Sequence, residues 1–248
     1  METKIKKEKV IEESDESSDS EFYKGKELLT DIETYLKSGV HIGTKFKSGE
    51  MRKYIFKKRK DGLMVFNIET IDQRIRMIAK LFAKYEGKDI AIICRRLYGY
   101  QAAKKMGAMI GARVITGRFI PGTFTNPRSR SFFEPKIVLL CDPATDAQAL
   151  KEASENNLAI VSLAGSDSQI KNIDLILPAN NKGRKSIALI FYLLTREILI
   201  ERKEISKDAF TAKPEDFEQE IEEKPVEKRS FSRGRFKSRF GAKRQQRR

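Results

Sequence analysis

The sequence of 248 residues contains few of the residues on which metal sites, disulfide frameworks and membrane spans depend. It has two cysteines, one histidine and no tryptophan. Two cysteines cannot build a disulfide framework, so the composition is typical of a reducing compartment. A single histidine excludes any site that needs two. No segment approaches the roughly 18 apolar residues of a membrane span, and the N-terminus lacks the apolar stretch of a signal peptide. We therefore expect a cytoplasmic protein.

Positive charge, by contrast, is abundant. Lys and Arg number 50 against 35 Asp and Glu, which gives a net charge of +15 and a sequence pI near 9.7. Such an excess favours a polyanionic partner, nucleic acid first and an anionic membrane surface second. The charge is unevenly distributed, with −4 on residues 1–21, −6 on 208–223, +10 on 224–248 and the remaining +15 on residues 22–207.

These shifts in composition predict four regions. Residues 1–24 form an acidic extension, expected to be disordered because it has too few apolar residues to form a core. Residues 25–205 form the folded domain, 206–223 an acidic linker and 224–248 a basic tail. In the tail, Arg233, Arg235 and Arg239 alternate with phenylalanines, and this combination suits phosphate pairing and base stacking. The alternative is a solvated tail without a fixed role.

Strand and helix patterns alternate through the folded region. Helices are predicted over residues 28–36, 71–85, 102–110, 144–156 and 184–203, and strands over 54–56, 63–68, 89–95, 113–116, 136–142, 158–164 and 174–177. The outer face of the 71–85 helix is predicted to carry Asp72 among basic residues. This alternation predicts a three-layer, Rossmann-like α/β domain with a mainly parallel sheet, flanked by disordered charged termini.

No arrangement of residues in this domain suggests a reaction. The predicted strand ends carry neither GxGxxG nor a P-loop. Cys94 and Cys141 are interpreted as buried, inert thiols, and His41 as a structural residue. Asp142 ends a strand, where a catalytic carboxylate could lie, but Thr145 and Gln148 fit a helix capping box instead. We predict no enzyme, no catalytic residue, no cofactor and no metal. An RNA-modifying or nucleotide-binding α/β enzyme remains the alternative, and a peripheral membrane protein is a third hypothesis.

Three basic segments are predicted to bind RNA, mainly through phosphates. The first contains Lys45, Lys47, Arg52, Lys53, Lys57, Lys58, Arg59 and Lys60, with Glu50 as its only acid. The second is the loop of residues 117–135, with Arg118, Arg128, Arg130 and phenylalanines that suggest an ordered loop. The third is Lys182, Arg184 and Lys185 at the start of the last helix, where free N–H groups favour a phosphate. Ordinary solvated loops are the alternative.

Residues 39–44 (GVHIGT), 118–126 (RFIPGTFTN) and 180–186 (NNKGRKS) resemble the three signatures of the small-subunit ribosomal protein two family. The resemblance covers about residues 26–205, and the lack of a long coiled-coil insertion resembles the archaeal and eukaryotic branch. It implies a non-catalytic domain on small-subunit rRNA, between head and body, in contact with neighbouring ribosomal proteins. It adds Asn126 to the expected RNA anchors, and implies no membrane and no small-molecule partner. The 165–169 loop departs from the family pattern, and both termini lie outside the resemblance.

Overall fold

The computed structural model describes residues 28–205 and 210–219. Its centre is a five-stranded parallel sheet in the order β4-β3-β5-β6-β7. The central strands are apolar and buried on both faces, which requires a layer of chain on each side. The strands are β3 (Ile90–Cys94), β4 (Arg113–Thr116), β5 (Ile137–Leu140), β6 (Ala159–Ala164) and β7 (Leu175–Pro178).

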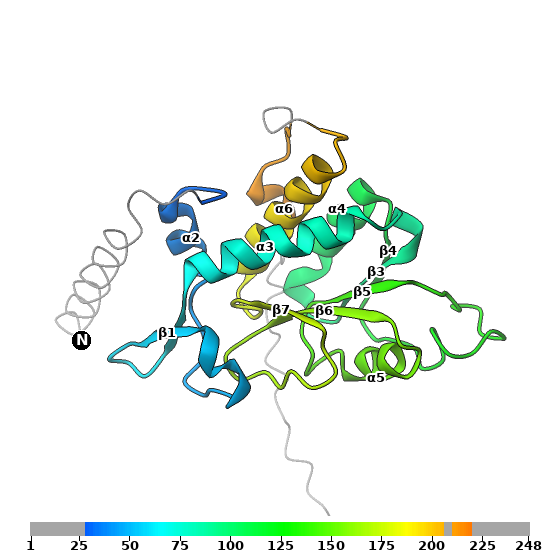
Figure 1. Cartoon of the computed structure of the whole chain (residues 1–248), viewed down its shortest axis with the longest axis horizontal. Helices are drawn as coiled ribbons and strands as arrows, with labels where there is room; N and C mark the ends of the chain where they lie inside the picture. The colour runs from blue at the N-terminus through cyan, green and yellow to red at the C-terminus, as the bar shows by residue number, and fades with distance from the viewer. Residues whose placement is uncertain (1–27, 206–209, 220–248) are drawn as a thin grey trace, which may run out of the picture.

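Helices cover both faces of this sheet (Figure 1). On one face lie α3 (Ile68–Ala83), α4 (Tyr100–Ile110) and α6 (Arg184–Glu201), and on the other α5 (Ala147–Glu155). The predicted three-layer α/β architecture is therefore confirmed. The shorter elements are α2 (Ile32–Ser38), η1 (Glu50–Tyr54), β1 (Ile55–Lys58), β2 (Met64–Phe66), η2 (Gly87–Asp89), η3 (Leu97–Gly99) and η5 (Pro214–Phe217).

The long loop of residues 117–135 completes the α5 face. It connects β4 to β5 with no helix of its own, and its phenylalanines fill the space beneath it. Phe119 and Phe124 are buried, with ring centroids 5.1 Å apart in an edge-to-face arrangement. They pack with residues of β3, β5 and α5 in a second core cluster. Of the three phenylalanines after Gly122 that suggested an ordered loop, Phe124 is buried and Phe133 packs against this cluster, whereas Phe132 is not part of it.

A buried carboxylate fastens this loop to α5. Glu152 is only 3% exposed, and its two oxygens accept the backbone N–H groups of Gly122 at 2.8 Å and Phe124 at 3.2 Å. Asn156, one turn further along the chain, donates its side-chain amide to the Phe124 carbonyl at 2.8 Å. Hydrogen bonds to a charged acceptor are stronger than neutral ones, so Glu152 holds the loop where a crossover helix would otherwise pack.

The boundary between β2 and α3 differs from the prediction. The strand expected to reach Ile68 ends at Phe66, and the helix expected from Ile71 begins at Ile68. Asn67 explains the change, because its side-chain oxygen accepts the Glu69 N–H at 3.0 Å and caps the helix. An N-terminal cap of this kind satisfies a backbone donor that has no partner inside the helix.

Asp72 was predicted on the outer face of α3, and this was wrong. It is 3% exposed and accepts hydrogen bonds from the Leu29 N–H (2.9 Å), the Tyr35 hydroxyl (3.1 Å) and Arg76 Nε (2.9 Å). Burial, followed by the nearby Asp72 charge, raises the pKa of Tyr35 well above its usual range. Asp72 therefore ties α2 and the chain before it to α3.

The segment 210–219 packs against α6 and α4. Phe217 is fully buried and lies edge-on to Tyr192, with ring centroids 5.9 Å apart. The predicted region boundaries remain predictions, but this part of the expected acidic linker contributes an aromatic side chain to the core. The expected N-terminal extension and basic tail lie outside the described residues.

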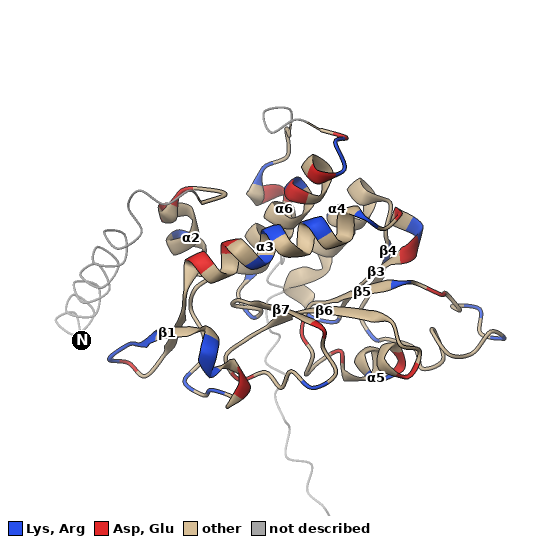
Figure 2. Cartoon of the chain, viewed as in Figure 1, with Lys and Arg blue, Asp and Glu red and all other residues tan. Residues whose placement is uncertain are grey.

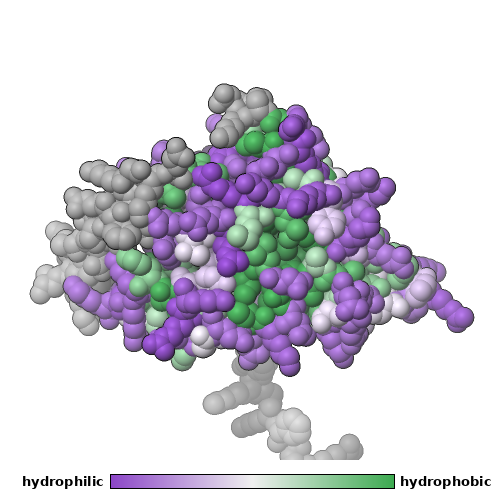
Figure 3. Space-filling model, viewed as in Figure 1, coloured by the Kyte–Doolittle hydropathy of each residue, from purple (hydrophilic) through white to green (hydrophobic). Residues whose placement is uncertain are grey.

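No helix of the described residues is long and apolar enough to cross a membrane. The face shown in Figure 3 is mostly hydrophilic at its rim, with an apolar area over β6 and β7 below α3. Partly buried Ile170, Ile173 and Leu175 are among the residues that pack against the main core.

The Glu152 contacts lead to a stability prediction. Glu152→Ala leaves two loop N–H groups without their acceptor, so we expect a loss of about 2–4 kcal/mol in the free energy of unfolding. Glu155→Ala, on the same helix but exposed, is the matched control and should change stability by less than about 0.5 kcal/mol. Urea unfolding measures both. Equal effects of the two substitutions would contradict the role given to Glu152.

Candidate nucleic-acid interface

The carboxyl ends of the five parallel strands meet at one edge of the sheet. The chain leaves β3 toward β4 on one side and returns to β5 on the other, so the strand order reverses between β3 and β5. In open α/β sheets, ligands bind in the crevice at such a reversal. The residues after β3 and β5 therefore decide whether a small-molecule site exists here.

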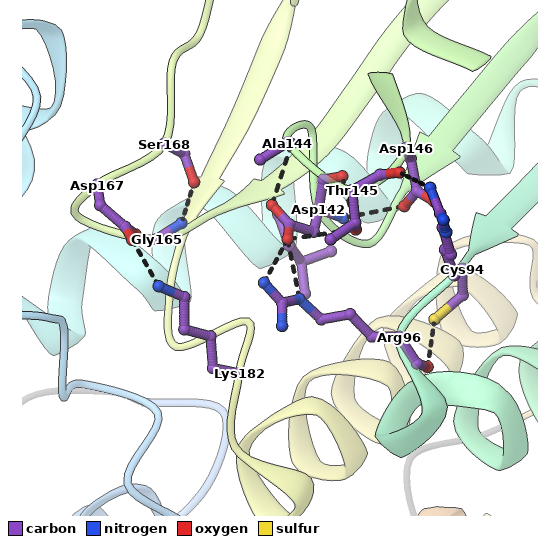
Figure 4. Close-up of polar contacts among 12 residues, drawn as sticks. Cys94, Arg96, Asp142, Ala144, Thr145, Asp146, Gly165, Asp167, Ser168 and Lys182 are labelled. Atoms are coloured by element: carbon purple, nitrogen blue, oxygen red, sulfur yellow. Dashed lines mark hydrogen bonds and ion pairs between the residues drawn. The ribbon is translucent and has the colours of Figure 1, made fainter. Parts of the chain in front are cut away.

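An ion pair occupies this position (Figure 4). Arg96, after β3, donates both Nε and Nη2 to Oδ2 of Asp142, after β5, with Nε at 2.9 Å. Asp142 is 2% exposed, and its Oδ1 accepts the Ala144 N–H at 3.2 Å. Gly99 packs so closely against the end of β3 that a Cβ added to it would be 2.5 Å from the Cys94 sulfur. An ion pair of the protein's own side chains thus lies at the position where related folds hold a ligand.

The predicted capping box after Asp142 was wrong. The helix α5 begins at Ala147 with Asp146 as its N-cap, and no side-chain capping bond forms. The Thr145 hydroxyl instead turns back to Asp142, 3.4 Å from its carbonyl oxygen and 3.3 Å from Oδ2. Thr145 therefore supports the Arg96–Asp142 pair, whereas the Gln148 side chain donates to Glu152 Oε1 at 2.9 Å.

Two buried groups beside this pair have raised pKa values. Burial raises the pKa of Asp146 to about 7, and the negative charge of Asp142 adds to the effect. The pKa of the Cys141 thiol is raised by its hydrogen bond to Cys94 and by burial. Both cysteines are buried, as predicted. A raised thiol pKa disfavours the thiolate, which is the nucleophilic form. Among the described residues, no group of three or more His, Cys, Asp or Glu could hold a metal ion.

The first predicted basic segment forms a continuous basic surface around the β1–β2 hairpin. Its residues lie on the 43–48 loop, on η1, on β1 and in the turn that follows, visible as blue segments in and below β1 in Figure 2. Six of its side chains are exposed and two are half-buried. The exposed ones are Lys45, Lys47, Arg52, Lys53, Lys58 and Lys60, and the half-buried ones are Lys57 and Arg59.

The acid within this basic surface is already engaged. Glu50 Oε2 accepts the Ile170 N–H at 3.2 Å, so the carboxylate is held toward the 165–170 loop. Within residues 28–205 and 210–219, none of the six exposed cations forms an ion pair with a carboxylate. Their charges are therefore available to an outside anion.

The third predicted segment follows Asn180, which binds the chain just before the 43–48 loop. The backbone N–H of Asn180 donates to the Val40 carbonyl at 2.9 Å, and its side-chain amide donates to the Gly39 carbonyl at 3.1 Å. Lys182 pairs with Asp167 at 2.5 Å (Figure 4). Segments about 140 residues apart in sequence thus form one edge. Arg184 pairs with Glu218 at 3.4 Å, whereas Lys185 is exposed.

The second predicted segment is not part of this surface. The 117–135 loop runs from the carboxyl end of β4 to the amino end of β5, and Figure 2 shows it extending to the right, opposite the β1–β2 hairpin. Arg118, Asn126, Arg128 and Arg130 are all exposed. The Asn126 side chain accepts the Arg128 N–H at 3.0 Å, which stiffens the loop tip. Any RNA contact here is separate from that at the hairpin.

Sequence reasoning did not identify two residues of the carboxyl edge. Ser166 links the 43–48 loop to β6 through hydrogen bonds to Thr44 and Phe46, and Arg95 is exposed beside the β5 loop, 3.4 Å from the Thr145 carbonyl. The one sequence feature that could have identified Ser166 and Arg95 is their position directly after predicted strands, because the loops after parallel strands lie at this edge. The predicted tail contacts Arg233, Arg235 and Arg239 lie outside the described residues and remain predictions.

Comparison with known proteins gives one consistent family. A family model described as ribosomal protein S2 matches residues 128–200. Proteins named small ribosomal subunit protein uS2 match over a longer range. The one from Saccharolobus solfataricus is 45% identical over 76% of this chain and 81% of its own length. Those from Staphylothermus marinus and Ignicoccus hospitalis are 49% and 43% identical, over 76% and 77% of this chain and 86% and 88% of their own lengths.

The raised pKa of Asp146 leads to a pH prediction. Because the folded protein holds this proton more tightly than the unfolded chain, ionisation of Asp146 lowers stability as the pH rises from about 4 to about 7. Asp146→Asn removes this dependence. We expect the variant to gain on the order of 2 kcal/mol relative to the original protein between about pH 4.5 and pH 7.5.

Urea unfolding of both proteins at the two pH values measures this change. An effect of the substitution that does not depend on pH is the same at both values and cancels when the two stability differences are subtracted. Asp61→Asn, in the exposed hairpin turn, is the control and should show no such gain. A constant difference between Asp146→Asn and the original protein at both pH values would contradict the prediction.

Proposed function

The chain belongs to the ribosomal protein S2 family, and on this premise we propose that it is a structural constituent of the small ribosomal subunit in the cytoplasm. The observation that carries this proposal is identity of 43–49% to small-subunit proteins over three quarters of the chain. The resemblance drawn from the three sequence signatures is thereby confirmed. The protein associates with small-subunit rRNA and with other ribosomal proteins, and supports assembly and translation.

The choice of the residues that would contact rRNA rests on their charge and exposure. The basic surface of residues 45–60 would neutralise rRNA phosphates, because its exposed cations have no internal carboxylate partner among the described residues. Lys182 and Lys185 would extend this contact along the carboxyl edge. The tip of the 117–135 loop would form a second, separate anchor through Asn126, Arg128 and Arg130, with Arg118 at its start. Two anchors on opposite sides of the domain (Figure 2) suit a protein that bridges the head and body of the subunit.

The alternative of an RNA-modifying or nucleotide-binding enzyme has no support. The matching family is that of a structural ribosomal protein and not of an enzyme. The geometry agrees with this, because Arg96 and Asp142 fill the reversal point of the sheet. A nucleotide there would have to break this ion pair, and leaving the buried Asp142 carboxylate without its partner is strongly unfavourable.

Sedimentation of the tagged protein from its own cell extract tests the proposal. We expect it to move with the small subunit at low salt and to remain there through a moderate salt wash, since many phosphate contacts act together. A protein that stays at the top of the gradient at both salt concentrations would overturn the ribosomal assignment.

A triple substitution tests the hairpin surface itself. Arg52→Ala, Lys58→Ala and Lys60→Ala together remove three exposed cations, so binding to purified small-subunit rRNA should weaken. The slope of log affinity against log salt should become shallower by about 2–3, because each lost phosphate contact removes about 0.7–0.9.

The matched control replaces Lys80, Lys104 and Lys151, three exposed lysines on the helices α3, α4 and α5. It lowers the net charge by the same amount away from the proposed surface. If both triple variants shift the slope equally, only overall charge matters and the hairpin assignment fails.

A further inference from the structure

Phe46 is the most exposed of the large apolar side chains in the described residues, at 78%. It lies in the 43–48 loop between Lys45 and Lys47, both exposed. A single exposed apolar residue is common on protein surfaces, so exposure alone carries no meaning. The meaning of this exposure depends on whether the surrounding chain fixes the backbone at Phe46.

One side of the loop is fixed by the 165–168 turn after β6. The hydroxyl groups of Thr44 and Ser166 each donate to the Phe46 carbonyl at 3.0 Å. Ser166 Oγ also accepts the Thr44 N–H at 2.8 Å, and the Ser166 carbonyl accepts the Ser48 N–H at 2.8 Å. The backbone on both sides of Phe46 is therefore bound to a rigid strand end.

The other side is fixed by the β1–β2 hairpin. The Gly43 N–H donates to the Met64 carbonyl at 2.7 Å, and the Met64 N–H donates to the Thr44 carbonyl at 3.0 Å. The 165–168 turn and the β1–β2 hairpin both lie so close to the loop that a Cβ on Gly43 would be 2.9 Å from Ser166 Oγ and 3.0 Å from the Met64 carbonyl oxygen. Glycine is needed for this approach, and the result is a clamped loop whose aromatic ring faces solvent.

The charge around the ring is positive. Lys45 and Lys47 form no ion pair within residues 28–205 and 210–219, and the Glu50 carboxylate is engaged by the Ile170 N–H. An apolar pocket of another protein would have to desolvate these two ammonium groups without giving them partners. A nucleotide offers the ring a base to stack on and gives each lysine a phosphate.

We propose that Phe46 is a stacking platform for one unpaired base of RNA, with Lys45 and Lys47 contacting the phosphates on either side. This inference rests on the proposed function and adds a recognition element to it. The basic surface supplies attraction to any phosphate backbone, whereas an exposed ring on a clamped backbone, between two lysines, selects a position where a base is free to stack.

The absence of tryptophan from the chain allows a direct test. Phe46→Trp introduces a single indole at the platform, and stacking on a base should quench its fluorescence when purified small-subunit rRNA is added. A duplex RNA of about 12 base pairs, whose bases are already paired, should bind through its phosphates with little quenching. Met77→Trp, half exposed on α3, is the control and should not be quenched by either RNA.

Affinity measurements separate stacking from general apolar contact. Because a base–aromatic stack is worth about 1–3 kcal/mol, Phe46→Ala should weaken binding to the rRNA by about 5- to 150-fold. Phe46→Leu should weaken it similarly, since leucine is apolar but has no aromatic face, and Phe46→Tyr should retain near-original affinity. The high exposure of the ring means that these substitutions should leave folding intact, which thermal unfolding checks.

The outcomes distinguish this inference from the ribosomal assignment. If Phe46→Ala binds rRNA as tightly as the original protein while the hairpin triple variant binds weakly, the platform is wrong and the assignment stands. If Phe46→Leu retains affinity that Phe46→Ala loses, the contact is apolar and the stacking proposal is overturned. If the original protein neither binds rRNA nor sediments with the subunit, the proposed function fails as well.

Discussion

The burial of α6 along most of its length is the constraint on which the other helices depend. The chain from Ile187 to Leu194 is apolar on nearly every side, and α3 and α4 pack along it while α2, η3 and η5 contact it at further points. A helix that is apolar all round is stable only when it is covered all round. Once α6 is fixed in this way, its first residues are fixed too, and the Asn180–Lys185 turn is held at the carboxyl edge of the sheet.

The elements that sequence periodicity predicted well are those whose burial is uniform. β3, β5 and β6 are short apolar runs bounded by polar residues, and their identification needs no knowledge of their neighbours. Asp72 shows where this reasoning ends, because a carboxylate on a helix faces inward when a tyrosine hydroxyl from α2 and a backbone N–H from the chain before α2 reach it. Asn67 is similar, since its short side chain fits both a loop and a helix cap, and only the local geometry decides.

The sequence predicted which charged residues form the candidate site, but not the contacts that hold their loops in place. The cationic residues of 45–60 stand out in the sequence because eight of them surround a single acid. The contact that rigidifies their loop comes from Ser166, about 120 residues away, and no local pattern signals it. The same holds for Glu152, whose role depends on a loop about 30 residues earlier meeting it across the α5 face. Long-range polar contacts that reach a loop are therefore one part of what the sequence does not signal.

The reversal point of the sheet, where related folds bind ligands, is occupied here by a pair of the protein's own side chains. The reversal point of a parallel sheet opens a crevice that something must fill, because buried polar groups at strand ends need partners. In this chain Arg96 and Asp142 fill it from within, and the neighbouring Asp146 and Cys141 have raised pKa values that keep them uncharged more readily. The convergence of strand ends that positions catalytic groups in an enzyme here positions a cationic edge. The rigidity of this edge favours RNA binding, because a flexible basic loop loses conformational entropy when it binds. A clamped loop has already lost that entropy on folding.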